Sequence, residues 1–168
     1  MNADAFRHLY AWHFAENRKI WDAHITALSP EQFTQAADYS HGSVRKQIAH
    51  LIEVEAVWFS ELAGIEPCDP LLPVDLDDRQ SLRTRWDIVE ARMRAYLADL
   101  HDDALFDKPI QDPEEDKDLI VWQVLLHVIT HGTDHRAQLL RTLHDLGCKT
   151  GSQDYIFYVY DHPMGTGL

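Results

Sequence analysis

The chain has 168 residues, of which 45% are hydrophobic, and this is enough for one domain with a buried core. Its 15 basic and 28 acidic residues give a formal net charge of −13, which disfavours binding to nucleic-acid backbones and to anionic lipid surfaces. The most apolar run, residues 119–129, is too short to cross a bilayer, which takes about 20 residues. We therefore expect one domain over residues 1–168 that binds neither nucleic acid nor membrane.

The N-terminus lacks the basic and apolar regions of a secretory signal. Two cysteines, Cys68 and Cys148, have no spacing typical of a disulfide framework or of a C-x-x-C site. We interpret them as free thiols in a reducing compartment, and we expect the protein to be cytoplasmic.

The first expected helix covers residues 3–28. Its inward stripe repeats at steps of three and four, and it includes two polar residues, His13 and Asn17, which need partners if they are buried. A short helical turn is expected over residues 29–33, with Ser29 as its N-cap in a capping box.

The second expected helix begins after the N-cap Ser43 and ends at Gly64. Three prolines make a helix improbable in the loop over residues 65–78. The third helix begins at Ser81 or just before it, and its apolar residues between positions 82 and 100 alternate at steps of four and three. This is the clearest amphipathic pattern in the chain.

The fourth expected helix covers residues 118–146 and ends at Gly147. The aromatic run at residues 155–160 is too apolar to remain in water, so we expect it to pack on the bundle or on a partner subunit. Four long amphipathic segments without strand alternation predict an all-α protein, an antiparallel four-helix bundle.

The sequence contains 11 histidines. Six stand alone on helix faces or in loops, and we interpret them as surface or packing residues: His8, His24, His41, His101, His144 and His162. Three others, His127, His131 and His135, recur every four residues on the fourth helix. Each step of four turns the helix about 40° past a full turn, so these three share one face. An H-x-x-x-H pair projects two imidazoles from successive turns, which suits a metal ion.

The outer two of these histidines are about 12 Å apart along the helix axis, so one pair with a third ligand from another helix is the expected arrangement. His50, beside the inner face of the second helix, is the best candidate for that ligand. Three imidazoles without a thiolate leave positions open for water or substrate, which is typical of a catalytic site. The alternative is a stack of core histidines hydrogen-bonded to carboxylates such as Glu53 or Asp134.

Two segments resemble signatures of the DinB-like (DinB/YfiT) metalloenzyme family. SHGSVRKQIAHL at residues 40–51 resembles the family's helix-two signature, and WQVLLHVITHGTDHRAQ at residues 122–138 resembles its helix-four signature. AENR at residues 15–18 is a weaker match that includes Asn17. The resemblance implies a four-helix bundle with up-down-down-up connectivity, often assembled as a homodimer.

The metal ligands that this resemblance implies are His50, His131 and His135. They would hold a divalent transition metal, with zinc or nickel expected first and iron as another candidate. His127 then remains a core residue or a residue that supports the site. Asp134 stands where many members have a further histidine, and it would place a carboxylate near the metal.

The resemblance also implies a function, because relatives in this superfamily include transferases that use low-molecular-weight thiols. A metal at an open site lowers the pKa of a bound thiol and positions the thiolate against a small electrophile. Asn17 or Glu53 would orient a ligand or the substrate. Two alternatives stay open: a metal-dependent hydrolase, and a non-enzymatic metal- or small-molecule-binding stress-response protein. The sequence has no nucleophile elbow, phosphate-binding loop or dinucleotide fingerprint.

Overall fold

The structure, a computed structural model, describes residues 2–69 and 78–164 of the chain. These residues form six α-helices and two short 3₁₀ turns, and they contain no β-strand. The all-helical fold predicted from the sequence is therefore confirmed. Four of the helices are long, with 20 to 25 residues each.

The first long helix, α1 (Ala3–Ala23), begins at the N-cap Asn2, whose side chain accepts a backbone N–H of the first turn. It ends before the predicted boundary at residue 28. The chain then tightens into a 3₁₀ turn, η1 (Ile25–Ala27), which directs Ile25 into the core, where it is fully buried. The apolar stripe therefore spans two elements instead of one helix.

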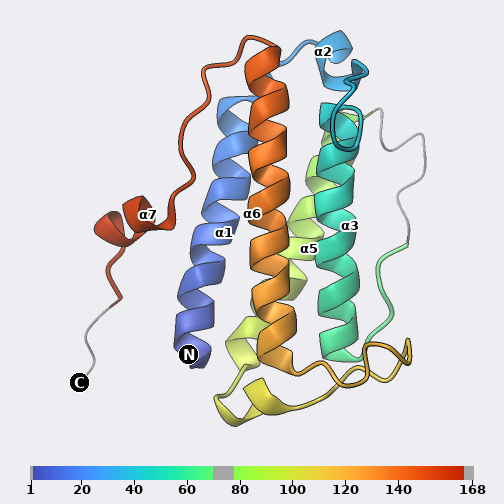
Figure 1. The fold of residues 1–168 in the computed structure, drawn as a ribbon, viewed down its shortest axis with the longest axis vertical. Coiled ribbons are helices and arrows are strands. Elements are labelled where there is room, and N and C mark those ends of the chain that lie inside the picture. Colours follow the sequence, from blue (N-terminus) through green and yellow to red (C-terminus); the bar gives the residue numbers. More distant parts are fainter. Residues whose placement is uncertain (1, 70–77, 165–168) are drawn as a thin grey trace.

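A short helix, α2 (Pro30–Thr34), follows with the expected capping box. The Ser29 hydroxyl accepts the backbone N–H of Gln32 at 3.2 Å, and the Gln32 side chain accepts the backbone N–H of Ser29 at 3.0 Å. These two bonds satisfy groups that a helix start leaves without partners. In Figure 1, α2 and the loop after it lie at the end of the molecule where the next long helix begins.

The second long helix, α3 (Val44–Ala63), keeps both predicted ends. Ser43 is its N-cap, and its hydroxyl accepts the backbone N–H of Lys46 at 3.3 Å. Gly64 ends the helix with a φ of 62°, in the left-handed region that glycine adopts without strain.

The third long helix, α5 (Arg79–Asp99), begins just before Ser81, as expected. The Asp78 side chain caps it by accepting two backbone N–H groups of the first turn. In the predicted loop before it, residues 65–69 are not helical, and residues 70–77 lie outside the described part of the chain.

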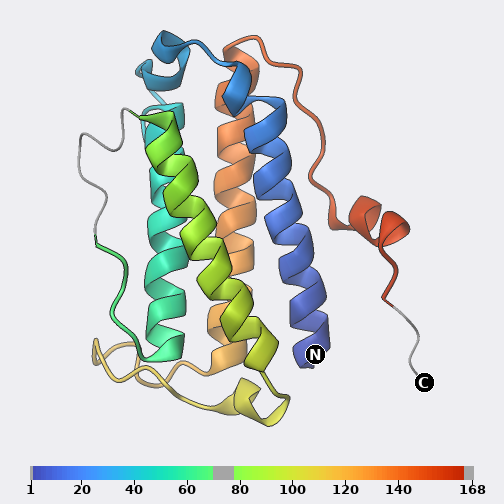
Figure 2. The same ribbon diagram turned by 180° about the vertical axis from the view of Figure 1, so that it is seen from behind.

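The longest helix, α6 (Val121–Asp145), lies within the predicted span 118–146. The four long helices lie side by side (Figures 1 and 2), and α1 and α3 each contact both α5 and α6. Side chains from all four helices are buried between them: Phe6, Tyr10, Ile48, Leu51, Leu82, Met93, Leu125 and Leu139. This packing sets one face of α3 against one face of α6.

The aromatic tail forms a short helix, α7 (Tyr155–Asp161), which lies beside α1 in Figure 1. The Tyr155 hydroxyl lies 2.7 Å from Nδ1 of His8, and its ring meets the Trp12 ring edge-on at 5.4 Å. On the other side of α7, Phe157 and Tyr160 are 55% and 70% exposed. The tail therefore packs on the bundle through only one of its faces.

Candidate metal centre

Three histidines from two neighbouring helices converge where α3 faces α6. His50 projects from α3, and His131 and His135 project from successive turns of α6. The centroid of the His50 ring lies 5.1 Å from that of His131 and 4.5 Å from that of His135. The rings of His131 and His135 are 4.2 Å apart. The structure thus brings together the three side chains that the family resemblance implies as ligands.

The local sequence explains why these rings lie at the rim of the core. His50 follows buried Ala49 and precedes buried Leu51, so it stands at the edge of the buried face of α3 and is itself half-buried. On α6 the four-residue spacing places two imidazoles one above the other. Both side chains remain half-buried, so each keeps part of its surface exposed to solvent.

The distance between ring nitrogens fits a shared cation. Nε2 of His50 lies 3.2 Å from Nε2 of His131. Two imidazole nitrogens bound tetrahedrally to one zinc ion, each at 2.0–2.1 Å, are about 3.3 Å apart. The same separation permits an N–H···N hydrogen bond between two neutral rings. The gathering of several imidazoles at one place is what favours a metal over such a bond.

The protonation of the three rings favours metal binding. Burial, and then neighbouring His41, His135 and His131, lower the pKa of His50 to about 4. Burial and the nearby His135 lower the pKa of His131 to about 4 as well, and burial lowers the pKa of His135. At neutral pH the rings are therefore uncharged, and a neutral imidazole is the form that binds a metal.

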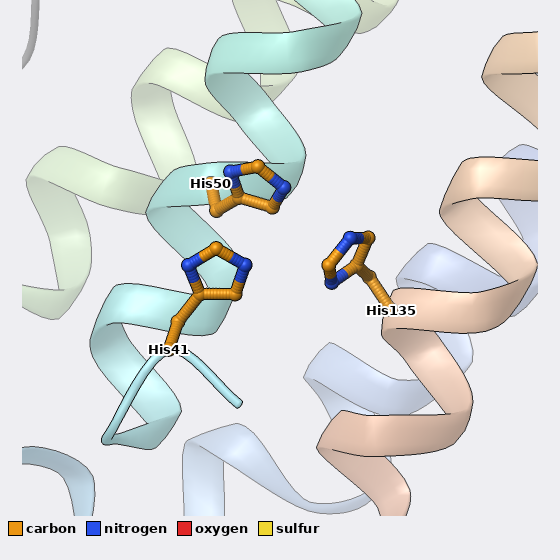
Figure 3. Close-up of side chains that lie close together, drawn as sticks. All are labelled: His41, His50 and His135. Carbon is orange, nitrogen blue, oxygen red and sulfur yellow. The ribbon is translucent and has the colours of Figure 1, made fainter. Parts of the chain in front are cut away.

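A fourth imidazole, that of His41, lies at the same place. Figure 3 shows its ring below that of His50 and across from that of His135. The His41 and His50 rings stack at 3.9 Å with planes 23° apart, and the His41 and His135 rings are 5.1 Å apart. One nitrogen of each of these three residues lies within 4.8 Å of the others. Our interpretation of His41 as a surface or packing residue missed this contact.

Gln47 on α3 forms hydrogen bonds with His135 on α6. Its buried side chain donates from Nε2 to the backbone oxygen of His135 at 3.1 Å, and Nε2 lies 2.9 Å from Nδ1 of the same residue. Because an amide nitrogen can only donate, Nδ1 of His135 is the acceptor in this contact, and the two contacts hold the His135 ring in one orientation.

The family model of the DinB family matches residues 1–164. The chain belongs to the DinB family. No match is found among curated proteins. Within the described ranges, no helix of this DinB-family protein has both the length and the hydrophobicity needed to cross a membrane.

The other predicted site residues of the DinB-family chain lie at different depths. Asp134 is exposed on α6, accepts a hydrogen bond from Gln138 at 3.0 Å, and raises the pKa of His131 against the larger effect of burial. His127 is exposed one turn before His131, and its ring meets the Trp58 ring edge-on at 5.3 Å. Glu53 is exposed on α3.

Asn17 lies inside the bundle, in a hydrogen-bonded network with four other residues. The buried carboxylate of Glu55 accepts hydrogen bonds from His13 at 2.7 Å and from Trp86 at 2.9 Å. Asn17 donates to Glu55 at 3.1 Å and accepts from Arg136 at 2.9 Å. Arg136, which is fully buried, also donates to Nδ1 of His13 at 2.9 Å. Each polar side chain of this network therefore has a partner, as burial requires.

The partners of His13 define its protonation. Because a guanidinium can only donate, Nδ1 of His13 accepts from Arg136, and the ring proton is on Nε2, which donates to Glu55. Burial, and then the charge of Arg136, lower the pKa of His13. A neutral imidazole thus lies between a buried cation and a buried anion.

Sequence reasoning identified Asn17 and His13 as inward polar residues but singled out Glu53 instead of Glu55. Glu55 lies three residues after buried Ile52 and four before buried Phe59, which is the spacing of core positions on a helix. The signal for Glu55 was therefore present in the sequence.

Proposed function

We propose that this DinB-family protein binds one divalent transition metal through His50, His131 and His135. The observation that carries the proposal is the convergence of these rings from two helices, with two Nε2 atoms 3.2 Å apart. Neutral imidazoles suit zinc and nickel first, and ferrous iron also accepts them. The chain's own role is to hold three uncharged nitrogen donors in place before the cation arrives.

We further propose that the metal site serves a thiol-dependent S-transferase that acts on small electrophiles. A bound cation would supply Lewis acidity that lowers the pKa of a coordinated low-molecular-weight thiol. Half-burial of His131 and His135 leaves the site open to small molecules from solvent. The edge formed by Trp58 and His127 adds aromatic surface beside His131, where an apolar part of a substrate can rest.

Connectivity and assembly are part of the same proposal. The up-down-down-up order of a four-helix bundle is supported by the course of the chain in Figure 1, where α1 and α6 run in one direction and α3 and α5 in the other. A homodimer is supported by the exposed aromatic residues of α7, Phe157 and Tyr160. The free thiols of Cys68 and Cys148 support a reducing, cytoplasmic location.

Two measurements test the proposed function. Untagged protein is analysed for bound metal and then titrated with zinc, together with His131→Ala and with His144→Ala, an exposed histidine on the same helix, as the matched control. Zinc affinity is expected to fall by at least about tenfold in His131→Ala and to stay unchanged in His144→Ala. Equal affinity in all three proteins would contradict the metal site.

The activity is tested separately on metal-loaded protein. Glutathione, bacillithiol or mycothiol is mixed with a model electrophile, and the conjugate is quantified with and without the metal. Metal-dependent conjugation that disappears in His131→Ala is expected. Turnover of an ester without thiol would favour the hydrolase, and metal binding without turnover of either substrate would favour a binding protein.

A further inference from the structure

We propose that His41 is a fourth ligand of the metal site, supplied by the loop between α2 and α3. This inference rests on the proposed three-histidine site and goes beyond it, because a fourth imidazole fills the coordination position that a substrate would need. The loop then controls whether the site is closed or open.

The loop holds His41 in a defined position. Ser40 has a φ of 50° and Gly42 a φ of 84°, so the backbone is in the left-handed region on both sides of His41. The N–H of Ala37 donates to the carbonyl of Gly42 at 2.8 Å, and the N–H of Gly42 donates to the carbonyl of Tyr39 at 3.0 Å. These bonds close the turn on itself, and His41 projects from its tip.

Buried Gln47 ties the same turn to the ligands on α6. Its Oε1 accepts from the Ser40 hydroxyl at 2.8 Å and from the backbone N–H of His41 at 3.4 Å. Its Nε2 donates to the backbone of His135. One carboxamide therefore fixes His41 and His135 relative to each other. Oε1 of Gln138 on α6 also lies against the Ser40 hydroxyl and competes with Gln47 for its one proton, so the turn touches that helix at a second point.

The ring geometry places His41 within reach of a shared cation. Its ring is half-buried and stacked on His50 at 3.9 Å, and one nitrogen of each of His41, His50 and His135 lies within 4.8 Å of the others. Ligands of one tetrahedral zinc are about 3.3 Å apart, so a shared cation would draw these nitrogens closer together. His131 is joined to the same group through its 3.2 Å contact with His50.

Four imidazoles give a different site from three. Four protein ligands complete the tetrahedral shell of zinc, as in structural sites, whereas three leave a position for water or substrate. With His41 bound, the site holds its metal more tightly and is closed to thiols. Withdrawal of the turn at Ser40–Gly42 opens one position while His50, His131 and His135 keep the ion.

The first test uses cobalt(II) as a spectroscopic probe and zinc for affinity, in the full-length protein, His41→Ala, and the control His144→Ala. The wild type is expected to give the intense visible absorption of a four-coordinate site. His41→Ala should bind zinc at least about tenfold more weakly, show a changed cobalt spectrum, and respond to added 2-mercaptoethanol at a lower concentration than the wild type. An unchanged affinity and spectrum in His41→Ala would overturn the proposal.

A second test needs no variant. Imidazole ¹⁵N resonances are followed in the wild type as one equivalent of zinc is added. Four histidines are expected to shift to metal-bound values, and a shift confined to three, without His41, overturns the fourth ligand while the three-histidine site stands. Absence of any shift overturns both.

Discussion

Two polar clusters share α3 and α6 but differ in how their hydrogen-bonding groups are satisfied. Inside the bundle, His13 lies between Arg136 and Glu55, and each of its ring nitrogens has a partner of fixed role. At the α3–α6 rim, Nε2 of His50 faces Nε2 of His131, so ring nitrogens meet other ring nitrogens. The inner cluster is complete as it stands, whereas the rim cluster gains most from an added cation.

This difference assigns the two clusters different roles. Breaking a satisfied buried network removes stability, because a buried charge or polar group then lacks its partner. Removing a ring from the rim relieves crowding between imidazoles that burial already keeps neutral. Stability should therefore depend on the inner cluster and metal affinity on the rim.

The largest expected effect is on metal binding by the double variant His50→Ala/His131→Ala. Loss of two direct ligands should weaken zinc binding by at least about a hundredfold, since loss of a residue that only supports a ligand already costs 10- to 100-fold. The free energy of unfolding of the metal-free protein should stay within about 0.5 kcal/mol of the wild type. Competition with a zinc chelator and urea unfolding in EDTA measure the two quantities. A large loss of stability with little loss of affinity would reverse the assignment.

The next effect is on stability, in Glu55→Gln. The amide presents a donor where His13 or Trp86 also donates, and it leaves the buried Arg136 cation without its compensating charge. Breaking a buried charged network in this way costs about 3–5 kcal/mol. The matched control is Glu53→Gln, two residues away on the same helix and exposed, which should change stability by less than about 0.5 kcal/mol. Urea unfolding in EDTA decides, and equal effects of the two variants would show that the inner network is not a source of stability.

A smaller loss is expected for Gly132→Ala, which tests how closely α6 approaches α1. A Cβ at this position would lie 2.5 Å from Cε1 of His13 and 3.2 Å from Nη1 of Arg136. Forcing these groups apart should cost about 1–3 kcal/mol. Gly151→Ala is the control, since a Cβ there meets nothing within 4 Å. Thermal unfolding of both variants checks the prediction, and an unaffected Gly132→Ala would mean that the two helices separate at little cost.

The helical parts of both clusters could be predicted from the sequence, because helix periodicity fixes which residues share a face. The spacing of His131 and His135 and the inward positions of His13 and Asn17 followed from this rule. Glu53 was chosen over Glu55 although two residues turn a helix by about 200°, which separates a core position from an exposed one. The helix was predicted correctly, but the wrong one of these two glutamates was assigned to the buried face.

His41 could not be placed by the same rule. Its position depends on left-handed backbone at Ser40 and Gly42 and on hydrogen bonds from the loop to Gln47 and Gln138. Those contacts join residues that periodicity does not relate, and they form only when α3 and α6 pack together. The end of α1 was missed for a related reason, because burial of Ile25 in a 3₁₀ turn is decided by the core and not by the helical stripe.

The smallest expected effect is on the pH dependence of stability, and it comes from His13 in the inner cluster. The folded pKa of His13 is lowered by burial and by Arg136, against opposing effects of Glu55 and Glu90, whereas the unfolded chain has a value of about 6.5. As the pH falls below about 6.5, the unfolded state takes up a proton that the folded state does not, so His13 lowers the free energy of unfolding by up to about 1.4 kcal/mol per pH unit. Above that pH its contribution is constant.

Replacing His13 with Gln removes this term, so the variant should be less stable at pH 7.5 but lose stability less steeply than the wild type between pH 6.5 and 5.5. Urea unfolding of both proteins in EDTA across this range gives the difference, and the rim histidines cancel because both proteins contain them. Keeping the pH above 5 excludes Glu55, whose lowered pKa makes its own contribution disappear only in stronger acid. Parallel pH profiles would mean that His13 takes up its proton as readily inside the bundle as in the unfolded chain, and the inner cluster would then be no more closed than the rim.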